Sequence, residues 1–126
     1  MQVKIDTKER FHVITIQEPD LTANMTEEFQ LSLLTYLQLE IKNVVLNLKD
    51  INSIDDAAAE TLINIQQRFY EENASFIVCE LKPSVEESLD NTGLLQIMNV
   101  VPSESEAGDI VQMEEIEREL LGGDES

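Results

Sequence analysis

Cysteine and basic residues are scarce in this chain, and each shortage excludes a class of structure or function. A single Cys among 126 residues rules out an intramolecular disulfide. Eight Lys and Arg stand against 26 Asp and Glu, so the formal net charge is −18. Such a charge repels the phosphates of nucleic acids and the surfaces of anionic membranes. We therefore expect neither nucleic acid nor a membrane as a partner.

Long apolar runs and a targeting signal are also missing. No run of roughly 18 apolar residues occurs, and the N-terminal segment does not show a basic stretch followed by an apolar one. These absences predict a cytoplasmic protein without membrane insertion. The length suits one domain, which we place at residues 1–121, and the remaining residues 122–126 are predicted to form a flexible acidic tail.

Motifs for catalysis or cofactor binding are absent as well. The sequence has no phosphate-binding loop, dinucleotide Gly pattern, nucleophile elbow or paired Cys/His ligands. Residues 50–54 begin like a calcium loop, but Ile54 stands where an oxygen ligand belongs. His12 and Cys79 lie within apolar strand patterns and are interpreted as structural residues. The sequence thus predicts a protein that is not an enzyme and needs no cofactor or metal.

What the chain does contain is a regular alternation of strand and helix patterns. An N-terminal strand hairpin comes first, and the segments after it alternate between helix and strand, with four helices in all. The predicted strands are 3–7, 11–16, 44–48, 76–81 and 95–101. The first predicted helix is 25–41, with its cap at 26–28, and the second begins at Asp56. The third begins at Pro83 and is ended by Gly93, and the fourth follows a cap at Ser103 or Ser105 and ends at 122–123. This order predicts an α/β sandwich around a mixed, mostly parallel sheet.

The last predicted helix is strongly acidic and carries apolar residues at helical spacing. Ile110, Met113, Ile116 and Leu120 are expected to form one apolar face. The simplest interpretation is a peripheral helix whose apolar face packs on the domain. The alternatives are a docking strip for a basic partner or for a second copy of the chain, which would make a homodimer.

Residues 44–62 run from a buried strand through a turn directly into a helix start. Unpaired backbone N–H groups and a partial positive charge make a helix start suited to binding, carrying or imitating an anion. The turn reads Asp55-Asp56-Ala57-Ala58. It resembles the signature of the STAS family, named for sulfate transporters and anti-sigma factor antagonists, in which this turn reads Asp-Ser-Ser/Thr-Gly and its first Ser is phosphorylated. Residues 82–85 and 91–94 resemble further family features, so the resemblance covers nearly the whole chain.

The resemblance implies a STAS-like fold, and it implies a function in protein interaction. Asp56 would occupy the phosphoserine position, so a permanent carboxylate replaces a switchable hydroxyl. The implied partner-binding residues are Thr22, Ser53, Asp55, Asp56, Ala57 and Ala58. The implied partner is an anti-sigma factor or a related serine kinase-like protein. Ala57 and Ala58 depart from the family pattern by replacing its second hydroxyl residue and its glycine.

Several interpretations of these residues remain open at this point. Asp56 either only caps the helix or imitates part of a phosphoserine, and Asp55 is either solvated or contacts the partner. Ser53 is either a capping oxygen or a displaced phosphorylation site. Rival functions are a STAS subunit of a lipid-transport complex, a signalling scaffold and, as the weakest, an aspartyl-phosphate carrier using Asp55 or Asp56.

Overall fold

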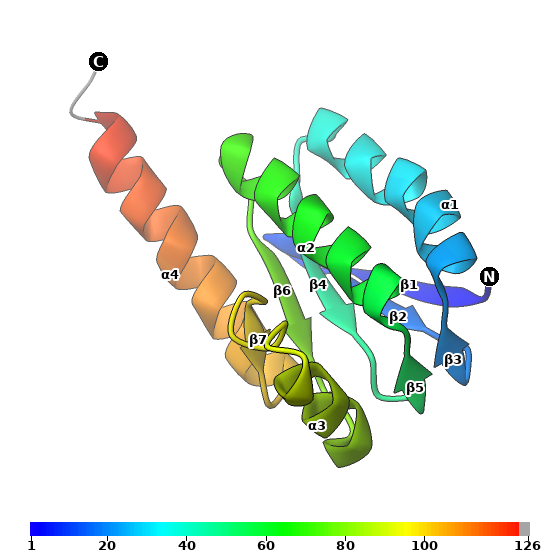
Figure 1. Ribbon diagram of the computed structural model, residues 1–126. Helices are drawn as coiled ribbons and strands as arrows, with labels where there is room; N and C mark the ends of the chain where they lie inside the picture. Colours follow the sequence, from blue (N-terminus) through cyan, green and yellow to red (C-terminus); the bar gives the residue numbers. More distant parts are fainter. Residues whose placement is uncertain (124–126) are drawn as a thin grey trace.

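A five-stranded sheet with helices on both faces forms the centre of the molecule (Figure 1). The computed structural model describes residues 1–123. Its elements are, in chain order, β1 (Val3–Thr7), β2 (Phe11–Ile16), β3 (Asp20–Leu21), α1 (Ala23–Thr35), the 3-10 helix η1 (Tyr36–Gln38), β4 (Asn43–Asn47), β5 (Ser53–Ile54), α2 (Asp56–Glu71), β6 (Phe76–Cys79), α3 (Pro83–Asn91), β7 (Val100–Val101) and α4 (Glu104–Gly123).

The sheet has the strand order β1-β2-β4-β6-β7. β1 pairs antiparallel with β2, and every other neighbouring pair in this sheet is parallel. Every residue of the central strands β4 and β6 is buried, as expected for parallel strands covered on both faces. The predicted fold class, a mixed α/β sandwich with an N-terminal antiparallel hairpin and four helices, is confirmed.

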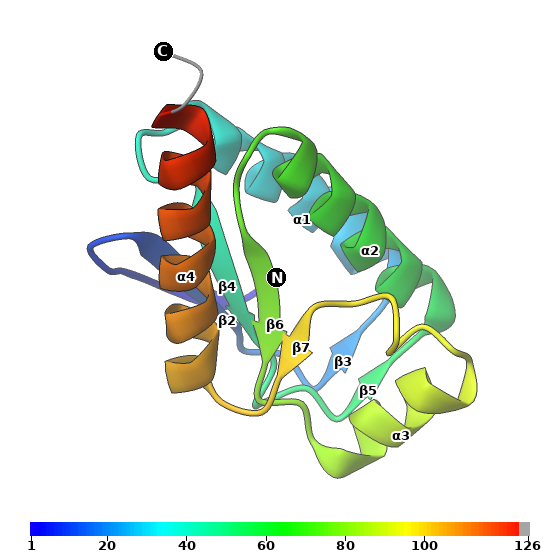
Figure 2. The ribbon, with the colours of Figure 1, turned by 90° about the vertical axis from the view of Figure 1, so that its left-hand side faces the viewer.

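The two faces of the sheet contribute to two separate cores, because successive side chains of a strand point in opposite directions. Val44 and Leu46 lie in the larger core together with Leu62 and Phe69 of α2. Val45 instead joins the smaller core beneath α4. Figure 2 shows the sheet between α4 on one side and α1 with α2 on the other.

Three predicted elements differ most from the structure, and the strand predicted at 76–81 ends already at Cys79. Helix α1 begins before residues 26–28, because Thr26 is buried inside the helix and its hydroxyl donates a 2.9 Å hydrogen bond to the carbonyl oxygen of Ala23. The helix also ends earlier than predicted, and Ile41 lies outside it. The last strand is only Val100–Val101, because turn bonds from Ile97 and Met98 to the Leu94 carbonyl hold the preceding chain away from the sheet.

The third difference concerns α4. Ser103 accepts a 3.2 Å hydrogen bond from the N–H of Glu106, so capping by Ser103 is confirmed, whereas Ser105 lies inside the helix. The predicted apolar face is right only for Ile110, which packs against the smaller core. It is wrong for Met113, Ile116 and Leu120, whose side chains are exposed, while Ala107 and Val111 are the fully buried residues. The helix extends to Gly123, and residues 124–126 of the predicted tail lie outside the described residues.

Candidate partner-binding surface

The short β3–β5 ladder brings the starts of α1 and α2 together. Leu21 pairs with Ile54, and the N–H of Asp55 donates a 3.1 Å hydrogen bond to the carbonyl oxygen of Leu21. Thr22 and Asp55, which immediately precede the two helices, therefore lie side by side at the end of the molecule where β3 and β5 are seen in Figure 1. Sequence reasoning missed this ladder because each of its strands has only two residues.

The carboxylate of Asp55 joins the two helix starts. One oxygen, Oδ1, accepts a 2.7 Å hydrogen bond from the N–H of Ala58 and so caps α2. The other, Oδ2, accepts a 3.1 Å hydrogen bond from the N–H of Ala23 in the first turn of α1. Both donors belong to the N–H groups that a helix start leaves without intrahelical partners. Asp55 is therefore a structural link between two elements that are 32 residues apart in sequence.

This geometry corrects the capping assignment. Asp56 is the first residue inside α2, and Asp55 is the N-cap, so the interpretation of Asp56 as the cap is wrong. The interpretation of Asp55 as merely solvated is wrong for the same reason. The side chain of Asp56 is exposed, and its negative charge lies beside the positive end of the helix dipole.

The remaining predicted residues divide between the surface and the core. Thr22, Ser53 and Ala57 are exposed, whereas Ala58 is fully buried and contributes its backbone N–H to Asp55. The Ser53 hydroxyl donates a 2.5 Å hydrogen bond to Oδ1 of Asp20 instead of capping α2, so the interpretation as a capping oxygen is wrong.

Asp20 is the residue of this surface that the sequence did not single out. Its exposed carboxylate comes near Ser53 through the pairing of β3 with β5, which places it on the same end of the molecule as Asp55 and Asp56. The exposed surface formed by Asp20, Thr22, Ser53, Asp55, Asp56 and Ala57 is called the helix-start surface below. Three carboxylates make it negative, which disfavours an anionic ligand.

His12 and Cys79 have structural environments, as predicted. The ring of His12 is buried, its Nε2–H donates a 2.9 Å hydrogen bond to the carbonyl oxygen of Ile41, and Nδ1 accepts one of 2.9 Å from the Thr7 hydroxyl. Burial raises the pKa of the Cys79 thiol to about 12, which keeps it protonated and unreactive at neutral pH.

Two searches of the described part of the chain bear on other functions. No group of three or more His, Cys, Asp or Glu side chains that could hold a metal ion is found within residues 1–123. Among the same residues, none of the helices combines the length and the apolar character needed to cross a membrane.

Comparison with known proteins identifies relatives of this fold. The family model of the STAS domain matches residues 2–107. No match was found among curated protein sequences. Among solved structures, the crystal structure of a putative anti-sigma factor antagonist from Thermotoga maritima superposes with a TM-score of 0.72 at 20% identity, covering 87% of this chain and 94% of that one.

Two further structures show the same fold. The anti-sigma factor antagonist SpoIIAA in its unphosphorylated form has a TM-score of 0.69 at 17% identity, with 88% of this chain and 96% of that chain covered. A serine-to-glutamate variant of RsbS from Moorella thermoacetica has a TM-score of 0.72 at 22% identity, with 89% and 96% covered. At these identities the likeness establishes the fold.

Proposed function

Because the chain belongs to the STAS domain family, we propose that it is a non-catalytic interaction module, similar to the anti-sigma factor antagonists, that binds a protein partner through the helix-start surface. The proposed partner is an anti-sigma factor or a related serine kinase-like protein. Solved relatives in this fold are described as anti-sigma factor antagonists, which supports this class of partner.

The position of Asp56 carries the proposal. Capping explains the presence of an acid at Asp55 but not at Asp56, because Asp55 supplies the oxygen that accepts from Ala58. The exposed carboxylate of Asp56 interacts favourably with the helix dipole, and by the resemblance of residues 55–58 to the STAS signature it would stand where the family has its phosphorylated serine. We propose that this carboxylate imitates the charge of phosphoserine and holds the module in one state.

The imitation is partial, and this limits what the charge alone can do. A carboxylate carries one negative charge and two oxygens, whereas phosphoserine carries roughly −1.5 to −2 and three acceptor oxygens. Both groups nevertheless place negative charge at the same position, so a serine kinase-like partner that releases its phosphorylated substrate should bind this protein more weakly than a variant without that charge. Removing the charge should restore binding to such a partner.

An Asp56→Ser variant tests this proposal against a matched control. Glu60 lies one helical turn further along α2 and is also exposed and acidic, so Glu60→Ser removes the same charge from a neighbouring position. The kinase-like anti-sigma factor of the same organism is immobilised, and binding and phosphate transfer from ATP are measured for the wild type and both variants.

We expect Asp56→Ser to bind at least about tenfold more tightly than the wild type, because a partner that releases its phosphorylated substrate would disfavour the negative charge that this variant lacks. We also expect the introduced hydroxyl to accept phosphate. Glu60→Ser should behave as the wild type does. Equal binding by all three proteins, with no phosphate transferred, would contradict the imitation of phosphoserine. Binding that persists after Asp56→Arg would contradict the location of the interface.

A further inference from the structure

The outer face of α4 exposes three large apolar side chains in one row. Met113 is 55% exposed, Ile116 48% and Leu120 69%. Their spacing of three and four residues places them on one side of the helix. The buried row is a different one, in which Ala107 and Val111 pack against strand residues such as Val45 and Ile77. The name outer stripe is used below for Met113, Ile116 and Leu120.

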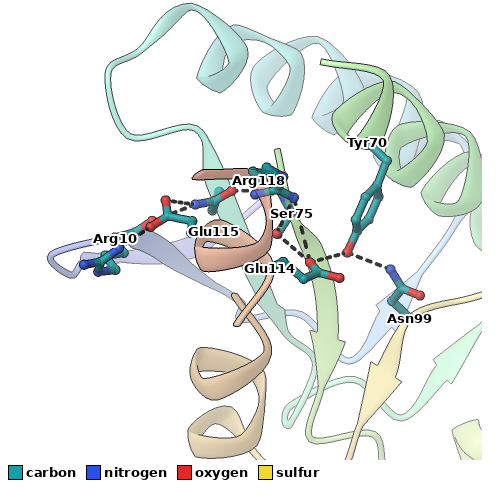
Figure 3. A network of polar contacts seen from close by, with 8 residues as sticks. Arg10, Tyr70, Ser75, Asn99, Glu114, Glu115 and Arg118 are labelled. Atoms are coloured by element: carbon teal, nitrogen blue, oxygen red, sulfur yellow. Dashed lines mark hydrogen bonds and ion pairs between the residues drawn. The ribbon is translucent and has the colours of Figure 1, made fainter. Parts of the chain in front are cut away.

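The exposure of the outer stripe is a consequence of how α4 is attached to the sheet. In its C-terminal half the inward positions are polar, and Glu114 accepts hydrogen bonds from the hydroxyls of Tyr70 (2.8 Å) and Ser75 (2.6 Å) (Figure 3). Arg118 donates a further 2.8 Å bond to Ser75. This polar network holds the helix in place, so the apolar side chains of the outer stripe are left free of any role in packing it.

The neighbouring Glu115 adds to this attachment. Its carboxylate forms a 2.7 Å ion pair with Arg10 and accepts a 2.7 Å hydrogen bond from the side-chain amide of Asn43. With two successive turns of α4 fixed by polar bonds, a rotation that would bury Ile116 or Leu120 would break several of them. The outer stripe is therefore a stable feature of the surface.

The exposed charged residues of α4 are all acidic. Asp109, Glu117 and Glu119 are exposed on α4, and none of the exposed residues of this helix within the described chain is basic. The nearby basic side chains, Arg10 and Arg118, are engaged with Glu115, Ser75 and Glu114. An apolar row with an acidic border thus faces the solvent.

We propose that the outer stripe of α4 docks a basic amphipathic segment of a second protein partner. Apolar side chains of such a segment would cover Met113, Ile116 and Leu120, while its Lys or Arg side chains would meet the acidic border. A second copy of this chain fits worse, because it would bring another charge of −18 and another acidic helix against the first. α4 lies across the sheet from α1 and α2, so this site goes beyond the proposed function and leaves the helix-start surface accessible (Figure 2).

The probe that tests this proposal is a designed helical peptide with Leu along one face and Lys along the opposite face. Its binding to the full chain is measured by fluorescence anisotropy beside two reference peptides, one with the same composition in scrambled order and one with Glu in place of Lys. The protein variant is the double substitution Ile116→Gln with Leu120→Gln. Leu31→Gln is the matched control, since Leu31 is an exposed apolar residue (73%) on another helix, α1.

We expect the amphipathic basic peptide to bind the wild type and the Leu31→Gln control equally. It should bind the double variant at least about tenfold more weakly. The two reference peptides should bind the wild type at least about tenfold more weakly than the probe, because each lacks one of the two matching features. Circular dichroism melting of every variant checks that the fold is retained.

Three outcomes would overturn the proposal. Equal binding of the probe to the wild type and the double variant would show that only net charge attracts it. Equal binding of the scrambled basic peptide would show the same. Sedimentation that reveals a dimer of the wild type, lost in the double variant, would identify a second copy of the chain as the occupant of the outer stripe.

Discussion

Replacing Asp55 by alanine should destabilise the protein far more than the same change at Asp56. Asp55→Ala removes two hydrogen bonds to helix N–H groups, one at Ala58 (2.7 Å) and one at Ala23 (3.1 Å). The loss of an N-cap typically costs about 1 kcal/mol. A second bond to a charged acceptor adds about 1 kcal/mol more at an exposed site. We therefore expect a loss of about 2 kcal/mol in the free energy of unfolding.

The corresponding balance at Asp56 comes out near zero. Removing its carboxylate forfeits about 0.3–1 kcal/mol of favourable interaction with the helix dipole. Alanine recovers about 0.5 kcal/mol, because it is a better helix former than Asp at a position inside α2. The variant Asp56→Ala should thus change the free energy of unfolding by less than about 0.5 kcal/mol.

Urea unfolding followed by circular dichroism measures both values, and thermal melting gives a second reading at about 4 °C per kcal/mol for a domain of this size. Asp55→Asn is an informative intermediate, since its amide has only one acceptor oxygen and can keep one of the two bonds. A stability of Asp55→Ala within 0.5 kcal/mol of the wild type, or a larger loss for Asp56→Ala than for Asp55→Ala, would refute the assignment of Asp55 as the link between the helices.

Three further predictions concern the α4 side of the sheet. Glu114→Ala should lower the free energy of unfolding by about 1–3 kcal/mol, because the hydroxyls of Tyr70 and Ser75 lose their hydrogen-bond acceptor. The exposed control Glu117→Ala should be nearly neutral in the same urea titration. Burial and Glu114 raise the pKa of Tyr70 above its usual 10.0, so the folded state favours the protonated phenol. The stability that this provides is complete below pH 10 and is lost as the pH rises further. The free energy of unfolding, measured with urea, should therefore decline less with rising pH in Tyr70→Phe than in the wild type, and an unchanged decline would contradict this role of Tyr70. Cys79, whose pKa burial raises to about 12, should react with a thiol reagent at pH 8 only when urea unfolds the chain, and rapid labelling of the native protein would show that the strand opens.

Periodicity in the sequence was sufficient for the sheet and the order of its elements. The largely apolar segments 44–48 and 76–81 predict buried strands, and alternation around Val3 and Ile5 predicts the hairpin. These patterns are local, and they report which side of each element faces the core. The resemblance of residues 55–58 to the STAS signature pointed to the family that the match over residues 2–107 establishes.

Contacts between distant segments were decided by the tertiary structure. Whether Asp55 also links α2 to α1 depends on the β3–β5 ladder, because the pairing of Leu21 with Ile54 brings the N–H of Ala23 within reach of Asp55. Nothing in residues 50–60 alone distinguishes two adjacent acids at a helix start. The same ladder placed Asp20 on the helix-start surface.

The orientation of α4 shows the same limit. Its large apolar residues suggested a packed face, but the space above β2, β4 and β6 is filled by small side chains, Ala107 and Val111, which let the helix lie close to the sheet. Gly108 shows how close, since a Cβ atom there would come within 3.0 Å of the Phe11 ring. The sequence by itself determined the four helices and the five strands of the main sheet, though not all of their ends, because these elements depend on local spacing. Only the packing of the whole chain decided which face of α4 is buried and which carboxylate links the helices, because both depend on partners far away in the sequence.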